Sequence, residues 1–213
     1  MRLAATLLLA LAACTGAGTG ARVEVTPRSG AQGPRVLAVV AHPDDETAFA
    51  GALYKITTHL GGVCDLVVLT NGEGGFKYAT LAERVYGAEL TDESVGRAEL
   101  PAIRKREMVD AARILGVRSV EFLGQTDHRY TTDVSEVLGE GAAVWNLALV
   151  RRELAEALAE ERYDFVFALA PSTTTHAHHQ AATALAAEAV LARPEGSRPV
   201  MLVAQVAREG EFV

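Results

Sequence analysis

Residues 35–53, RVLAVVAHPDDETAFAGAL, contain the two features that decide the fold of this chain. The run 35–40 is apolar after its first residue, which is typical of a strand buried on both faces of a parallel sheet. It is followed by one imidazole and three carboxylates in the short stretch His42 to Glu46, and a helical pattern begins near Thr47. Polar groups at that junction point to chemistry at the end of a buried strand.

Apolar runs and helical patterns alternate along the rest of the chain. Further strands are predicted at 64–70, 117–123, 163–169 and 199–207, and a short edge strand is one interpretation of 22–26. Helices are predicted at 47–60, 101–115 with Pro101 in the first turn, 144–162 and 179–192. This alternation predicts an α/β domain with a mostly parallel sheet and helices on both faces.

Polar clusters follow the predicted strands rather than precede them. After the cluster at 42–46 come NGEGG at 71–75, QTDHRY at 125–130 and PSTTTHAHH at 171–179. Since parallel strands open at one edge of a sheet, we expect these clusters to lie close together.

The connection 71–100 is too long for a simple link between two elements. It contains aromatic and acidic residues and a candidate short helix at 80–86. We predict a lid that shapes a substrate site, and the alternative is a structural Ω-loop over the sheet edge.

The spacing of histidine and aspartate predicts a metal site. His42 and Asp45 are three residues apart at one junction, and His176 and His179 are three apart at another. Two imidazoles and a carboxylate suit zinc with one open position, where the pKa of a bound water would fall to about 7. Asp44 or Glu46 would then be left as the general base.

Other interpretations of these residues remain open. Asp44 or Asp45 could cap the following helix, and a lone His176 or His178 is usually a solvated loop residue. The same ligand set also fits a non-haem iron oxygenase, although the α/β pattern disfavours that class. A dinucleotide site is disfavoured because NGEGG lacks the full glycine fingerprint, and a serine hydrolase because GxSxG is absent.

The amino terminus predicts export. Residues 1–13 resemble a signal peptide of lipoprotein type, with Cys14 as the lipidated first residue of the mature chain and residues 14–34 as a tether. Cleavage of an ordinary signal at Ala13 or beyond is the alternative. The expected location is the bacterial cell envelope, with membrane contact only through the lipid anchor.

Composition limits the partners. The chain has 213 residues, 49% of them hydrophobic, which suits one domain, assigned to 35–213. A net charge of −7 without a basic run disfavours nucleic acid. The second cysteine, Cys64, is expected to be a buried, inert thiol and Trp145 to be a core residue.

AHPDDE after the first strand, TNGEGG after the next, the helix RKREMVDAARILGV and the late HxxH resemble the PIG-L or LmbE-like N-deacetylases. The resemblance covers about 36–190. It implies a Rossmann-like fold and zinc-dependent hydrolysis of the linear amide of an N-acetylated amino sugar, by a metal-activated water.

Carried over by position, the resemblance implies a set of site residues. The metal ligands would be His42, Asp45 and His179, and Asp44 would be the general base. His176 would stabilise the oxyanion or protonate the leaving amine. Arg104 would help to hold substrate, and Asp127 would lie near the second histidine or the sugar hydroxyls.

One departure from the family pattern concerns the late motif, which is often HPDH and here reads HAHH, from His176 to His179. His178 therefore either replaces an aspartate that orients a ligand or competes as a ligand, and the spacing favours His179. His128 is expected to line the site.

The predicted function is thus removal of an N-acetyl or N-acyl group from an amino sugar or related small amide. A non-catalytic sugar- or metal-binding lipoprotein is the alternative outside enzymes. The sequence leaves open the choice of Zn²⁺ or Fe²⁺, the identity of the substrate and the oligomeric state.

Overall fold

The apolar run at 35–40 forms β2 (Arg35–Val40), whose residues after Arg35 are all buried. The computed structural model describes residues 20–26, 32–142 and 144–205. In it, β2 pairs in parallel with β3 (Val63–Thr70) and with β5 (Phe165–Leu169). β2 therefore lies inside the sheet, which explains its unbroken apolar sequence.

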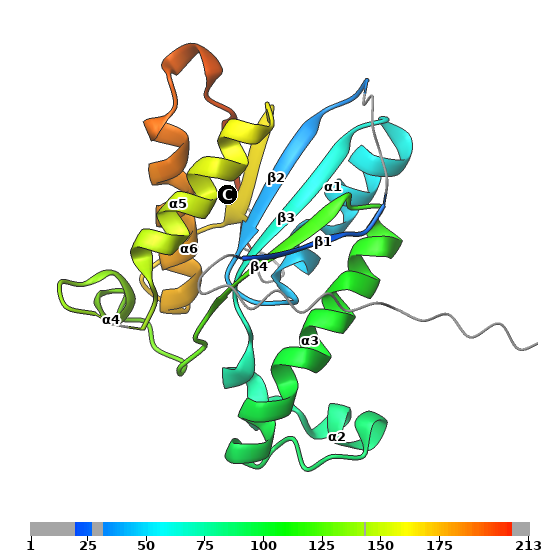
Figure 1. Ribbon diagram of the computed structural model, residues 1–213, viewed down its shortest axis with the longest axis vertical. Coiled ribbons are helices and arrows are strands. Elements are labelled where there is room, and N and C mark those ends of the chain that lie inside the picture. The colour runs from blue at the N-terminus through cyan, green and yellow to red at the C-terminus, as the bar shows by residue number, and fades with distance from the viewer. Residues whose placement is uncertain (1–19, 27–31, 143, 206–213) are drawn as a thin grey trace, which may run out of the picture.

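The sheet formed by the described residues has six strands in the order β1-β4-β3-β2-β5-β6 (Figure 1). β4 (Ser119–Gln125) and β6 (Val200–Ala204) continue the parallel arrangement, and the edge strand β1 (Ala21–Glu24) pairs antiparallel with β4. The predicted α/β class, the mostly parallel sheet and the edge strand near residue 22 are confirmed.

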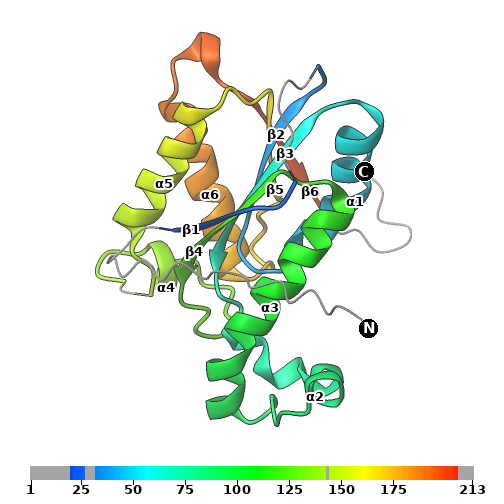
Figure 2. The same ribbon diagram turned by 45° about the vertical axis from the view of Figure 1, so that its right-hand side comes forward.

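Helices cover both faces of the sheet (Figures 1 and 2). Alternate residues of β2 point to opposite sides: Val36, Ala38 and Val40 pack in one core, and Leu37 and Val39 in the other. The first core lies under α1 (Ala50–Tyr54) and α3 (Glu93–Leu115). The second lies under α5 (Leu147–Glu160) and α6 (Ala177–Ala192).

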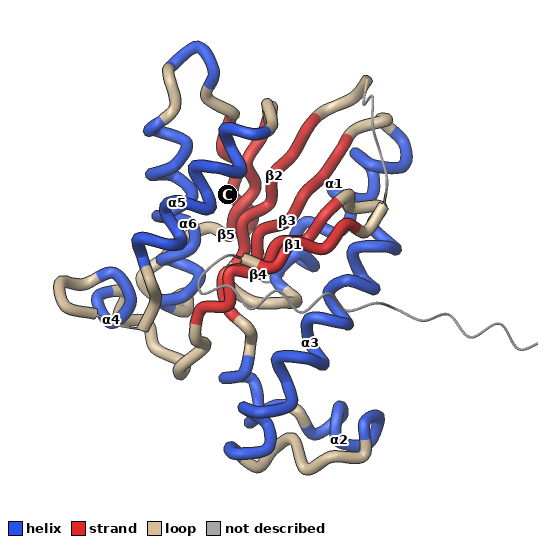
Figure 3. The backbone as a smooth tube through the Cα atoms, viewed as in Figure 1, coloured by secondary structure: helices blue, strands red, loops and turns tan. Residues whose placement is uncertain are grey.

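Shorter segments complete the described structure (Figure 3). They are the 3-10 segments η1 (Asp45–Phe49), η3 (Glu73–Tyr78) and η4 (Glu195–Ser197), the π-helical turn η2 (Lys55–His59), and the helices α2 (Thr80–Tyr86) and α4 (Ser135–Leu138). The helix predicted at 47–60 is therefore three consecutive helical segments of different pitch, η1, α1 and η2.

The start of α3 differs from the prediction. The helix begins at Glu93 rather than at Pro101, which lies inside it. Asp92 is the N-cap, and its carboxylate accepts the backbone N–H groups of Ser94 and Val95. The cap and the packing of Leu100 and Ile103 outweigh the hydrogen bond that proline removes from the helix interior.

The connection 71–100 is a small packed lobe and not an irregular loop. It contains η3, α2 and the first two turns of α3, which extend past the sheet in Figure 1. Phe76, Ala79 and Leu90 form a separate buried cluster with Leu100 and Ile103 of α3. The predicted short helix at 80–86 is confirmed, and the Ω-loop alternative is wrong.

Several predictions fall outside the described residues. The signal peptide at 1–13, Cys14 and the start of the tether are among them, as are the last two residues of the predicted strand 199–207. Cys64 and Trp145 are buried, as predicted. Within the described ranges, no helix has the length and apolar character needed to span a bilayer.

Asp65 forms a buried polar centre at the start of β3. Its carboxylate accepts hydrogen bonds from the Arg118 guanidinium, from Ser119 Oγ at 2.7 Å and from Tyr163 Oη at 2.8 Å. Only 3% of Asp65 is exposed. The one carboxylate thus joins β3 to the residues that lead into β4 and β5.

We predict that Asp65→Ala lowers the free energy of unfolding by about 3 kcal/mol, because the buried Ser119 and Tyr163 and the partly buried Arg118 lose their shared acceptor. Urea denaturation measures the loss. The control is Glu161→Gln, whose partly exposed carboxylate also pairs with Arg118 and whose loss should stay near or below about 1 kcal/mol. Equal losses in the two variants would contradict a special role for Asp65.

Candidate active site

The turn after β2 is organised by the carboxylate of Asp45. Its Oδ2 atom accepts the backbone N–H of Ala41 at 3.0 Å and of His42 at 2.8 Å. Asp44, the residue before Asp45, takes a backbone φ of 154°, the one positive φ among the described non-glycine residues. The chain reverses over these positions, so that His42, Asp44 and Asp45 all face the carboxyl edge of the sheet.

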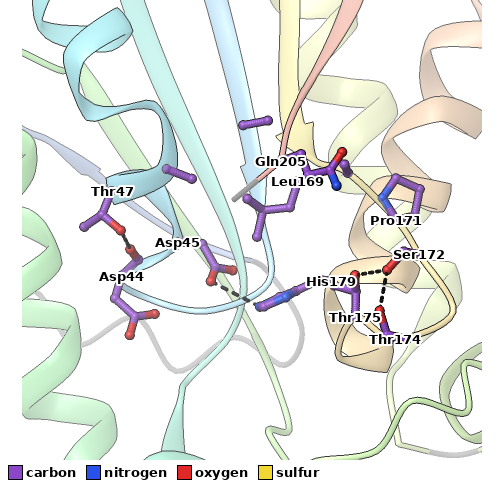
Figure 4. Close-up of a pocket in the computed structure, with 13 residues that line it drawn as sticks. Asp44, Asp45, Thr47, Leu169, Pro171, Ser172, Thr174, Thr175, His179 and Gln205 are labelled. Carbon is purple, nitrogen blue, oxygen red and sulfur yellow. Dashed lines mark hydrogen bonds and ion pairs between the residues drawn. The ribbon is translucent and has the colours of Figure 1, made fainter. Parts of the chain in front are cut away.

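His179, in the first turn of α6, meets this turn across the site (Figure 4). Its Nε2 atom lies 3.0 Å from His42 Nδ1 and 3.2 Å from Asp45 Oδ1. His42 Nδ1 lies 3.6 Å from Asp45 Oδ2. The three side chains come from two segments more than 130 residues apart in the sequence. The fold places the nitrogen and oxygen atoms that could bind a metal next to one another.

This donor set fits a divalent metal. One ligand atom from each of His42, Asp45 and His179 lies within 4.8 Å of the others. Zinc bonds of about 2.0–2.1 Å in a tetrahedron place ligand atoms roughly 3.3 Å apart, close to the spacings found here. Asp45 Oδ2 is held by the backbone, so Oδ1 is the oxygen free to bind a cation.

The carboxylates at the site favour a positive charge between them. Burial by itself would lower the pKa of His42, but the carboxylates of Asp127 and Asp45 raise it to about 9. Burial also opposes ionisation of Asp45, yet the imidazoles of His179 and His42 beside it hold the pKa of that carboxyl well below its usual range. A buried negative charge next to imidazole nitrogens is an environment that attracts a metal ion.

His176 is the N-cap of α6, and its Nδ1 atom accepts the backbone N–H of His178 at 3.0 Å. The Tyr130 ring packs edge-on against it, with centroids 4.9 Å apart. Burial, followed by the nearby His178 and His42, lowers the pKa of His176 to about 3. His176 is thus a neutral imidazole whose Nε2 carries the proton.

Arg104 connects the two loops at the mouth of the site. Its guanidinium donates to the carbonyl of Pro43 at 2.9 Å and to that of Gly72 at 2.7 Å, and it pairs with Asp44 Oδ2 at 2.9 Å. Gly72 has a left-handed φ of 73°, which favours glycine, and a Cβ atom there would lie 2.2 Å from the guanidinium and displace it. The NGEGG motif therefore serves close packing against Arg104.

Asp127 occupies the inner side of the site. Its Oδ1 atom lies 3.3 Å from His178 Nδ1 and 3.7 Å from His42 Nε2, and its Oδ2 atom accepts the backbone N–H of Gly74 at 3.1 Å. Burial opposes ionisation of Asp127, but the neighbouring imidazoles of His178 and His42 lower its pKa below its usual range. Asp127 lies beside the histidines, one of the two positions that the sequence left open.

Two cavities meet at the candidate metal site. One, of about 670 Å³, runs toward residues 169–175 and Gln205 and carries several hydroxyl groups. The other, of about 450 Å³, is lined by Arg104, Tyr130 and His176 and by the lobe at 74–82. Both are lined by Asp44, Asp45 and His179. The lobe thus forms a wall of the site, as the predicted substrate-shaping role requires.

The structure distinguishes between the two residues predicted as the general base, Asp44 and Glu46. Glu46 is buried, lines neither cavity and has one carboxyl oxygen without a hydrogen-bond partner among the described residues; burial raises its pKa to about 7. Asp44 is therefore the better placed base. The sequence did not single out Glu136, which hydrogen-bonds to His128, because nothing in its local sequence marks it.

The fold and the site define a class of α/β domains with a candidate metal site at the carboxyl edge of the sheet. The family model described as "PIG-L: GlcNAc-PI de-N-acetylase" matches residues 37–190. The chain therefore belongs to the PIG-L family, and the predicted membership of an N-deacetylase family is confirmed.

Named relatives agree with this assignment. The chain is 28% identical over 176 residues, 83% of its length and 68% of the relative's, to a probable N-acetyl-alpha-D-glucosaminyl L-malate deacetylase 2 of Bacillus anthracis. It is 37% identical over 90 residues to a 1D-myo-inositol 2-acetamido-2-deoxy-alpha-D-glucopyranoside deacetylase 3 of Catenulispora acidiphila, covering 42% of this chain and 24% of that one.

Solved structures share the fold. The N,N'-diacetylchitobiose deacetylase of Pyrococcus horikoshii superposes with a TM-score of 0.55 at 29% identity, over 75% of this chain and half of that one. The 4-carboxy-2-hydroxymuconate hydratase GalB of Pseudomonas putida superposes with a TM-score of 0.58 at 23% identity, over 81% of this chain and 62% of the other. At 23% identity, the second match shows the fold alone.

We predict that Arg104→Lys lowers the free energy of unfolding by about 1–2 kcal/mol, because an ammonium cannot reproduce both carbonyl contacts of the planar guanidinium. Urea denaturation measures the change. Arg106→Lys, on an exposed position of the same helix, is the matched control and should change stability by less than about 0.5 kcal/mol. Indistinguishable variants would show that Arg104 does not hold the two loops together.

Proposed function

We propose that this chain is a zinc-dependent hydrolase that removes the acetyl group from the nitrogen of an amino sugar. The observation that carries the proposal is the convergence of His42, Asp45 and His179 where two cavities meet, with Asp44 on the shared rim. Membership of the PIG-L family and the names of the relatives support the same reaction class.

When bound, the metal would activate a water molecule and polarise the amide carbonyl. His42, Asp45 and His179 would hold it, and Asp44 would accept the proton of the attacking water. The Asp44 side chain is 67% exposed and lines both cavities, so it can reach a substrate. Burial raises the pKa of Asp44 above its usual value, and the nearby Arg104 guanidinium opposes that rise. Once protonated, Asp44 can pass the proton to the departing amine.

His176 would stabilise the carbonyl oxygen as negative charge develops on it. Because its Nδ1 atom accepts the His178 N–H, its proton sits on Nε2, and it lines the cavity that contains Asp127 and Tyr130. A fixed N–H donor needs no reorganisation during the reaction, which makes such groups effective. Of the two roles predicted for His176, oxyanion stabilisation fits this tautomer better than proton transfer.

The expected substrate is a small N-acetylated sugar derivative. The larger cavity offers the hydroxyl groups of Thr47, Ser172, Thr174 and Thr175, which suit hydrogen bonds to a polar ligand. The relatives named above act on molecules that contain N-acetylglucosamine. The two cavities would place one part of such a molecule on each side of the scissile amide.

We predict that the chain releases acetate from members of a panel of N-acetylated amino sugars, that a chelator abolishes the release, and that Zn²⁺ restores it. An enzymatic acetate assay measures turnover; titration with Fe²⁺ under exclusion of oxygen compares the two candidate metals. Absence of acetate release from every panel member, with zinc bound at one ion per chain, would favour the non-catalytic metal-binding alternative.

We predict that Asp44→Asn lowers kcat by about 10²–10⁴-fold, because the general base is lost, while zinc stays bound. Asp110→Asn, at an exposed carboxyl of α3 that lines neither cavity, is the matched control and should keep full activity. A variant at Asp44 with unchanged kcat would assign the base to another group.

The proposal includes export. A signal at 1–13 with lipidation of Cys14 would place the domain at the outer face of the cell membrane, on a tether that ends before β1. Mass spectrometry of the mature amino terminus tests this: a diacylated Cys14, lost in Cys14→Ser, is the expected result. An unmodified residue after Ala13 would instead indicate an ordinary secretory signal.

A further inference from the structure

Five of the six histidines of the chain gather at the site: His42, His128, His176, His178 and His179. At the centre of this group is His178, which has no exposed surface. It is not one of the three ligands of the proposed metal site, although it belongs with His42, Asp127 and His176 to a second group that could hold an ion. The reaction as proposed makes no use of its ring. A fully buried imidazole in such a place needs a partner for each of its nitrogens.

Hydrogen bonds lead from the metal centre through His178 to a carboxylate near the surface. His42 Nε2 lies 3.1 Å from His178 Nδ1, His178 Nε2 lies 2.9 Å from His128 Nδ1, and His128 Nε2 lies 3.2 Å from Glu136 Oε2. The Glu136 side chain is 27% exposed. These four residues form a continuous row, called here the imidazole relay.

The outer end of the relay is fixed by other contacts. The Glu136 carboxylate accepts Arg129 Nη2 at 2.7 Å and Thr131 Oγ1 at 2.9 Å. The Trp145 ring packs against His178 with centroids 5.1 Å apart, and its Nε1–H donates to the carbonyl of Thr126. The His178 ring is therefore held at its face and at both nitrogens.

One set of protons satisfies the three contacts between neighbouring members of the relay. If His42 binds the metal through Nδ1, its proton must be on Nε2, and the nearest acceptor is His178 Nδ1 at 3.1 Å. Asp127 Oδ1 is farther from His42 Nε2, at 3.7 Å, and lies 3.3 Å from His178 Nδ1, so the His42 proton lies beside both of these acceptors. His178 then carries its proton on Nε2 and donates to His128, which in turn donates from Nε2 to Glu136. The last member of the relay, the Glu136 carboxylate, can only accept a hydrogen bond, which matches the donor on His128 Nε2.

We infer that His178, with His128 and Glu136, is a positioning residue that fixes the tautomer and the ring orientation of the metal ligand His42. The inference rests on the proposed function, in which His42 binds the metal. A ligand imidazole whose second nitrogen is held cannot rotate away from the metal, and loss of such a contact typically weakens metal affinity about 10–100-fold.

His178 also reaches the opposite side of the site. Its backbone N–H donates to His176 Nδ1, and the two rings lie 4.4 Å apart between centroids. The same residue thus fixes the tautomers of a metal ligand and of the proposed oxyanion donor. The contact to His176 is made by the backbone N–H of His178. Substitution of the His178 side chain therefore removes the contact to His42 and leaves the contact to His176 in place.

Two substitutions at His178 test the relay in the full chain. In His178→Asn the amide oxygen lies near the position of Nδ1 and can still accept from His42. In His178→Gln the longer side chain places its amide near the position of Nε2, toward His128, and leaves the His42 proton without an acceptor. Both variants change the same buried position. The Asn variant keeps the acceptor for His42, whereas the Gln variant keeps only the contact toward His128.

The readout is Zn²⁺ affinity, measured by competition with a chromogenic chelator, together with the ¹⁵N shifts of the His42 ring. We predict that His178→Gln weakens zinc affinity at least tenfold, that His178→Asn stays within about threefold of the parent, and that the His42 proton is on Nε2. His59→Asn, at the surface, is the control and should change neither. His128→Ala, expected to weaken affinity about fivefold, covers the case in which His178→Gln does not fold.

Three results would overturn the inference. Equal zinc affinities of the Asn and Gln variants, with both folded by circular dichroism, would show that the ring of His178 does not act through His42. A proton on His42 Nδ1 in the zinc form would reverse the tautomer. Two zinc ions per chain would mean that His42, His178 and Asp127 hold a second ion instead of a hydrogen bond. Failure of the parent to bind zinc would instead contradict the proposed function, on which the relay rests.

Discussion

The site depends on the hydrogen bonds from the backbone N–H groups of Ala41 and His42 to the carboxylate of Asp45. A parallel strand that ends at the sheet edge leaves such donors unpaired, and a buried unpaired donor is costly. Asp45 satisfies both with one oxygen and turns its other oxygen toward His179. The residue that closes the turn is therefore also the residue best placed to bind a cation.

The rest of the site follows from that turn. Closing it forces Asp44 into a positive φ, which places its side chain on the rim shared by both cavities. Arg104 then holds the loop carrying Pro43 against the loop carrying Gly72. On the other side of β2, the start of α6 supplies histidines with three distinct environments: one at the metal centre, one at the cavity wall and one buried. Fold and chemistry thus share the same few contacts.

Much of this architecture could be predicted from the sequence, because it depends on local patterns. The unbroken apolar run of β2 and the polar clusters after successive strands predicted both the parallel sheet and the edge that holds the site. The helix start at Glu93 was missed, since packing of the lobe at 71–100 outweighs the local effect of Pro101. Glu136 and the central place of His178 were missed for a related reason: their roles come from contacts between segments far apart in the chain.

The central claim is that His42, Asp45 and His179 bind one divalent ion beside a free Asp44. The most direct measurement is a crystal structure of the zinc-loaded protein with anomalous diffraction recorded at the zinc edge. The account predicts a single peak bonded to His42 Nδ1, an oxygen of Asp45 and His179 Nε2, with Asp44 unbound and facing the cavities. A peak that lies elsewhere, or a bond to His42 through Nε2, would contradict it.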